Sequence, residues 1–281
     1  MSLDHLHPFA GQHAIQTAAF AIDFSTELDV GEVGRLRAAA VQHLRADFPS
    51  ITDQQRAMVS MTSQPGQPLS TGATTVDAGG FVLERLSATA QPGTGQSSRS
   101  IIVSRENIIV VINDYTRWDR FKADVERYLS VLMESINAQK GVISIGLQIS
   151  DVFIWKADPA DLNVMEVFAE QTPFLVSNAL DPKIPLWHSH HGYVEEESEP
   201  LNYTRLNNVN IGRTMINGVH QIQILTSHKA TFGKILYKVL DVHKENISMV
   251  LNELHAKNKA ILSALLSPEL QEKIKLNAGK E

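Results

Sequence analysis

The chain has 281 residues, with 25 Lys and Arg against 31 Asp and Glu, a formal net charge of −6 and a pI near 6.0. This balance excludes a generally basic nucleic-acid-binding surface. An apolar fraction of 43% is enough to build the core of one large domain or of two ordinary ones. The chain has no cysteine, which excludes disulfides, thiol nucleophiles and thiolate metal ligands.

The N-terminal sequence has no charged segment followed by an apolar segment, so it does not indicate secretion. No apolar run approaches the roughly 20 residues that a membrane-spanning helix needs. Together with the lack of cysteine, these features favour a cytoplasmic location.

The first half of the chain has the pattern of a strand, a helix, several strands and a second helix. Residues 15–24 alternate loosely between polar and apolar, which favours a strand, and the following Ser25 and Thr26 offer helix caps. Apolar residues at steps of three and four predict a helix from Val33 to Phe48. Strands are then expected over residues 56–61, 80–88, 100–104 and 108–113, and a second amphipathic helix over residues 118–136.

Two segments between these elements, residues 62–79 and 92–98, are expected to be exposed loops because they are rich in Gly, Pro, Ser, Thr and Gln. Gly93-Thr94-Gly95 lacks a following Lys-Ser/Thr and precedes a strand. It therefore does not indicate a phosphate-binding loop.

From residue 142 the order of elements starts again. A long strand to Trp155, a short helix over residues 162–169 and a strand near Phe174 are expected first. Ser267-Pro268 predicts the start of a short terminal helix, since serine caps a helix and proline fits its first position. Between them we expect strands over residues 186–195, 204–211, 219–226 and 232–242, and a long helix over residues 245–266.

The two halves, residues 1–140 and 141–281, share this order of strand, helix, three to five antiparallel strands and helix. The sequence thus predicts an α+β protein of two similar domains related by internal duplication. Each domain is expected to be an antiparallel sheet covered by two amphipathic helices, because a sheet with one apolar face needs a cover. The helices at 33–48 and 162–169 are expected at equivalent places in superposable halves.

Several short segments of the chain together resemble a sporadically distributed family of uncharacterised bacterial cytosolic proteins. They are Asp47-Phe48-Pro49, Ser104-Arg105-Glu106-Asn107-Ile108, Tyr115-Thr116-Arg117-Trp118-Asp119-Arg120-Phe121, Ile145-Gly146-Leu147-Gln148, Leu254-His255 with Ile261, and Leu266-Ser267-Pro268-Glu269-Leu270. The resemblance implies an α+β fold and no established activity. The scattered occurrence of the family is typical of mobile or defence-associated genes. The chain departs from the family at Gln148, where arginine is usual, and at Ser267-Pro268, where Thr-Asp is usual, which weakens a binding role for these positions.

The most unusual local feature is a group of three histidines within residues 187–193. In a strand, His188 and His190 lie on the same face roughly 7 Å apart, close enough to share a zinc ion if a third ligand joins them. Glu196 and His220 are the candidates for that ligand. Histidines beside aromatic residues are also common on half-exposed sheets, and this structural interpretation is favoured. The opposite face is expected to carry His191, Trp187 and Tyr193.

Other catalytic patterns are weaker. No GxSxG nucleophile elbow occurs in the sequence. The residues around the start of the second helix would form a polar site, but helix capping and the helix dipole explain them better. These residues are Asp114, Arg117, Asp119 and Arg120. Trp118 and Phe121 are expected in the core, and the glutamates of residues 195–199 are expected on a solvated hairpin flank.

These patterns favour a non-enzymatic protein that binds or regulates another protein, in a bacterial defence or toxin-neutralising module, without a cofactor. The alternative is a metal-dependent hydrolase with zinc at His188 and His190. A homo-oligomer is also expected, because each half offers a sheet edge that can pair across a symmetric dimer. Membrane and nucleic-acid partners are not expected.

Overall fold

A computed structural model describes residues 3–62, 70–87, 97–136, 140–181, 184–198, 201–233, 237–238 and 244–276. These residues form an 11-stranded antiparallel sheet with the strand order β3-β4-β5-β6-β2-β7-β10-β9-β8. Two short strands, β1 and β11, pair with the two ends of β7.

The strands are β1 (Leu6–Pro8), β2 (Ile15–Phe24), β3 (Ser50–Thr62), β4 (Ser70–Leu86), β5 (Ser97–Ser104), β6 (Asn107–Ile112), β7 (Gly141–Trp155), β8 (Trp187–Glu197), β9 (Tyr203–Ile216), β10 (Val219–Thr231) and β11 (Tyr237–Lys238). The α-helices are α1 (Val30–His43), α2 (Trp118–Met133), α3 (Val164–Val167), α4 (Lys244–Leu265) and α5 (Pro268–Lys273). Short 3-10 helices are η1 (Leu3–His5), η2 (Pro159–Asp161) and η3 (Ser177–Leu180).

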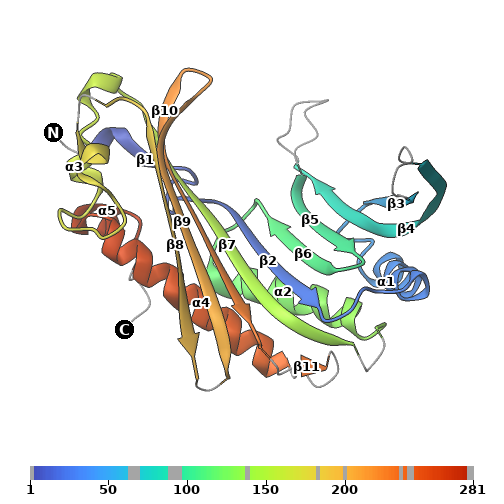
Figure 1. Cartoon of the computed structure of the whole chain (residues 1–281). Helices are drawn as coiled ribbons and strands as arrows, with labels where there is room; N and C mark the ends of the chain where they lie inside the picture. The colour runs from blue at the N-terminus through green and yellow to red at the C-terminus, as the bar shows by residue number, and fades with distance from the viewer. Residues whose placement is uncertain are drawn as a thin grey trace.

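The long helices lie on one face of the sheet. Helix α1 packs on β4 and on α2, α4 packs on β7 and β10, and α2 and α4 lie on the same side (Figure 1). Alternate residues of each strand point into this helix face, as Phe20 and Ile22 of β2 and Val110 of β6 do, and they are fully buried. A second buried cluster joins α3, α5 and the end of α4 to β1, β7, β9 and β10.

Side-chain caps decide where two of the helices begin. Asp29 Oδ1 accepts a hydrogen bond from the Glu32 backbone N–H at 2.7 Å, and the Glu32 carboxylate accepts one from the Asp29 N–H at 2.8 Å. This capping box starts α1 at Val30, so the prediction of caps at residues 25–26 is wrong. The predicted cap of α5 is confirmed, because Ser267 Oγ accepts from the Leu270 N–H at 3.3 Å.

The predicted fold class, two halves that each have a helix-covered sheet, is wrong. Strand β2 pairs with β6 on one side and with β7 on the other, so one sheet continues through the middle of the chain. The physical reason is that a separate sheet in each half would leave the backbone N–H and C=O groups of β2 and β7 unpaired at a sheet edge. Pairing β2 with β7 gives these groups hydrogen-bond partners. The helices predicted to be equivalent also differ, with 14 residues in α1 and 4 in α3.

Several predicted boundaries also change. The segment 62–79 is not a loop throughout, since β4 begins at Ser70, and the residues near Phe174 form turns rather than a strand. Helix α2 begins at the predicted Trp118. Of the strand predicted over residues 232–242, residues 232–233 are not in a strand, residues 237–238 form β11, and the remainder lies outside the described residues. Among the helices of the described residues, none has the length and apolarity to cross a bilayer.

Candidate interaction surface

The face of the sheet opposite α2 and α4 shows a continuous row of side chains across eight strands. Cross-strand register defines this central row, from β4 to β8, as Val82, Ile102, Ile109, Ala21, Gly146, Lys229, Leu206 and Val194. Its members alternate along their strands with fully buried residues such as Phe81 and Ile108, so the row faces away from the core. It is a stripe of apolar and small residues, interrupted by one lysine, on a face that no helix of the described residues covers.

The two ends of the central row differ in exposure. Val82, Ile102 and Ile109 are half-buried by their neighbours, whereas Leu206 is 40% exposed and Val194 is 60% exposed. Ala21 and Gly146 are paired in the middle, where neither residue has a large side chain. Next to them Lys229 Nζ lies 2.8 Å from Asp23 Oδ2, so the one cation of the row is paired.

Strand β8 forms one end of the sheet, and its residues alternate strictly between half-buried and exposed. His188 and His190 are both exposed and lie on the open face with Val194, as the two-residue spacing predicted. The half-buried face is confirmed to carry His191, Trp187 and Tyr193.

The two proposed third metal ligands do not lie beside this histidine pair. His220 is on the other face of the sheet, in step with the buried Ile222 and Ile224. Glu196 shares the face of His190 but lies six positions further along the strand, roughly 20 Å away. In the described part of the chain, no three His, Asp or Glu side chains are grouped for a metal ion. The zinc site stays a prediction without a structural third ligand.

On the helix side of β8, a polar network connects the strand to α4. Glu195 accepts hydrogen bonds from Lys257 at 2.6 Å, Arg205 at 2.9 Å and Asn207 at 2.8 Å. Burial opposes ionisation, but the hydrogen bonds from Lys257 and Arg205 lower the pKa of Glu195 to about 2. The same Asn207 contacts the buried His228 Nδ1 at 2.8 Å, and burial lowers the pKa of His228 to about 4. Of the predicted solvated glutamate flank, Glu196 is exposed, whereas Glu195 and Glu197 are half-buried and pair with Arg205.

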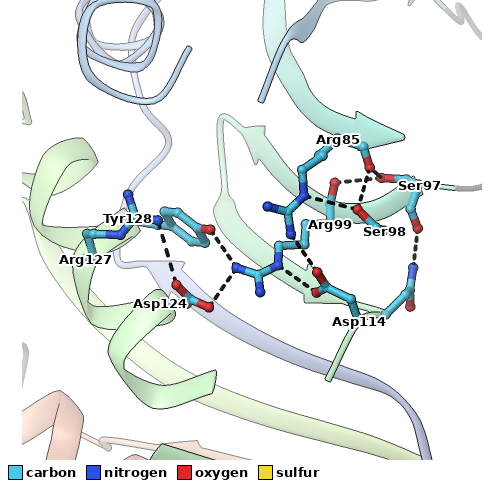
Figure 2. A network of polar contacts seen from close by, with 9 residues as sticks. Arg85, Ser97, Ser98, Arg99, Asp114, Asp124, Arg127 and Tyr128 are labelled. Carbon is cyan, nitrogen blue, oxygen red and sulfur yellow. Dashed lines mark hydrogen bonds and ion pairs between the residues drawn. The ribbon is translucent and has the colours of Figure 1, made fainter. Parts of the chain in front are cut away.

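A second polar network lies under the sheet between β5 and α2, and Figure 2 shows its members. Arg99, only 4% exposed, donates to Asp114 at 2.6 Å, to Asp124 at 2.7 Å and to the Tyr128 hydroxyl at 3.1 Å. Arg85 donates to the other oxygen of Asp114 at 2.6 Å. Burial opposes the charged form of Arg99, but its partners raise its pKa further above the ordinary value. The cations and carboxylates satisfy one another, which is typical of a structural network.

The structure also corrects the interpretation of Asp114 as a helix-capping residue. The N-cap of α2 is Arg117, which makes no side-chain cap hydrogen bond, and Asp114 instead binds the two arginines of β4 and β5. Trp118 and Phe121 pack on the core as expected. Trp118 also stacks on His255 of α4 with ring centroids 3.7 Å apart, which fixes the two helices together.

One buried carboxyl group stands apart from both networks. Asp151 of β7 is 3% exposed, and its Oδ2 has no hydrogen-bond partner among the described residues. Burial raises its pKa to about 7. No short sequence motif identifies Asp151. The signal in the sequence is that a charged residue interrupts the mostly apolar pattern of strand β7.

No protein-family model matches the chain, and a search of curated proteins finds no relative.

Proposed function

We propose that the protein is a non-enzymatic binding protein that holds another protein on the open face of its sheet. The observation that carries this proposal is the central row, which runs from Val82 to Val194 over eight strands on the face that none of the helices in the described residues covers (Figure 1). An apolar stripe of this length on an uncovered face costs free energy in water, and a partner with an apolar surface would remove that cost.

The polar networks support the same proposal. Arg99 and Glu195 lie on the helix side, and their charges are bound by neighbouring side chains of the same chain. A catalytic group needs access to a substrate and a free charge, whereas Arg99 is buried and the Glu195 carboxylate is held by Lys257 and Arg205. The resemblance to a sporadically distributed bacterial family supports the finer proposal of a role in a defence or toxin-neutralising module.

The test is site-specific photo-crosslinking in the host cell. A benzoylphenylalanine at Ile109 or at Ile102 is expected to capture the same partner protein, since both lie on the central row. Benzoylphenylalanine at the exposed Arg120 of α2 is the control and is not expected to capture this partner.

A variant links the capture to the stripe. Ile102→Lys places a charge in the central row beside Ile109 and is expected to abolish capture from Ile109. Equal capture from Arg120, or capture from Ile109 that persists in the lysine variant, would exclude the open face as the binding surface.

A further inference from the structure

We propose that β8 pairs antiparallel with β8 of a second copy of this chain about a two-fold axis at Gly192, joining two sheets edge to edge. This inference concerns the edge of the sheet and does not depend on a partner at the open face.

The first argument concerns the outer edge of β8, which the neighbouring segment 174–180 contacts through the Ser189 side chain and, among the residues that the structure describes, not through backbone hydrogen bonds. Strand β8 has 11 residues and ends the strand order, with β9 as its partner. Over residues 187–197 no backbone hydrogen bond to a turn or loop is found in the described part of the chain. A free edge of this length is a template for another strand, and β8 contains neither a proline nor a bulge that would block pairing.

The second argument is that β8 complements itself in the antiparallel direction. Its first half carries the three histidines and its second half carries Glu195, Glu196 and Glu197. Parallel pairing in register would bring the carboxylates of two copies together, and antiparallel pairing separates them. Centred on Gly192, the register places His188 opposite Glu196 of the second copy. Neutral and protonated imidazole both have an N–H group that can donate a hydrogen bond to the carboxylate. Two such pairs form, one on each side of the axis.

The third argument concerns the centre of the strand. Gly192 is the midpoint of residues 187–197, so this register pairs the strand over its full length. Asn208 Oδ1 lies 3.0 Å from the position that a Cβ on residue 192 would take, which explains a glycine there. On the open face His190 then lies opposite Val194 of the second copy, and it covers a valine that is 60% exposed in one chain.

Single cysteines test the register, because the natural chain has none. His190→Cys and Val194→Cys proteins are mixed and treated with a short bifunctional thiol reagent. A crosslinked dimer is expected from the mixture, whereas each protein alone is expected to stay uncrosslinked because its own cysteines would be roughly 13 Å apart across the axis. His190→Cys mixed with Thr52→Cys, an exposed position on β3 at the other edge, is the control and is expected to give no product.

Charge reversal tests the pairing energy by light scattering and sedimentation. The purified protein is expected to be a dimer. His188→Glu is expected to weaken dimerisation about tenfold, because the new carboxylate then lies opposite Glu196 of the other copy at each end of the paired strands. Adding Glu196→Lys to that variant is expected to restore the dimer, which also shows that the strand still folds. A monomer at all concentrations, a missing mixed crosslink, or a dimer insensitive to His188→Glu would overturn the proposal.

Discussion

Asp114, in the segment that leads into α2, accepts a hydrogen bond from the buried guanidinium of Arg99 at 2.6 Å. The contact joins strand β5 to the start of a helix that covers it, and Asp124 of that helix accepts a second bond from the same guanidinium at 2.7 Å. One arginine thus fixes the position of α2 on the sheet.

Removing this arginine is expected to be costly. Arg99→Met would remove the hydrogen bonds to the largely buried Asp124 carboxylate and the Tyr128 hydroxyl and leave Asp124 with its 3.7 Å ion pair to Arg127, so the free energy of unfolding should fall by about 3–5 kcal/mol. Urea denaturation measures the loss. Arg37→Met is the control, since Arg37 pairs with Asp53 where both side chains are exposed, and it should lose less than about 1 kcal/mol. Equal losses in the two variants would contradict a fixing role for Arg99.

The buried Asp151 should make stability depend on pH near neutrality. Its pKa is about 7 in the folded protein against an ordinary value of 3.8, so the folded state binds the proton more tightly than the unfolded state. Its contribution to stability is complete below about 3.8 and is lost as the pH rises through about 7. Wild-type protein should lose stability on the order of a few kcal/mol between pH 5 and pH 8, and Asp151→Asn should abolish this pH-dependent loss. Chemical denaturation at both pH values checks this, with the exposed Asp53→Asn as a control that keeps the loss.

Local patterns allowed part of the fold to be predicted. The bounds of β2, the start of α2 at Trp118 and the cap at Ser267 depend on residues within a few positions of each other. The alternation of β8 is equally local, so the face of His188 and His190 followed from strand geometry alone. The predicted strands over residues 204–211 and 219–226 are too short, because the Asn217-Gly218 pair, with φ of 51° and 79°, forms the tight turn that directly joins β9 to β10.

Contacts between distant segments were not predictable in this way. Pairing of β2 with β7 matches Phe20 with Leu147, and nothing in either strand names the other as its partner. The same holds for Arg99 and Asp124, which are 25 positions apart and come from a strand and a helix. The single sheet, the central row and the buried networks all depend on such pairings. Local sequence patterns are compatible with several strand orders, and tertiary packing selects one of them.

The network at Glu195 should protect the protein against acid. The pKa of Glu195 is about 2 in the folded protein against an ordinary value of 4.5, so its contribution to stability is present above about 4.5 and is lost as the pH falls through about 2. Glu195→Gln should therefore lower stability at pH 7 and flatten its decline between pH 4.5 and pH 2. Glu196→Gln, on the exposed face of the same strand, should leave the acid profile unchanged. Thermal unfolding over this pH range distinguishes the two, and identical profiles would show that the network adds no acid stability.

Gly80 of β4 should tolerate no side chain. Its φ is +151°, and a Cβ there would stand 1.9 Å from the carbonyl oxygen of Val103 on the paired strand β5. Because that oxygen belongs to backbone, relief requires the two strands to move apart, and Gly80→Ala should lower the free energy of unfolding by at least about 3 kcal/mol. Gly218→Ala is the matched control: its φ is +79° but no atom lies within 4 Å of the added carbon, so the backbone strain alone should cost about 1 kcal/mol. Urea denaturation of both variants measures the difference, and a Gly80→Ala protein as stable as Gly218→Ala would show that β4 and β5 separate without cost at this point.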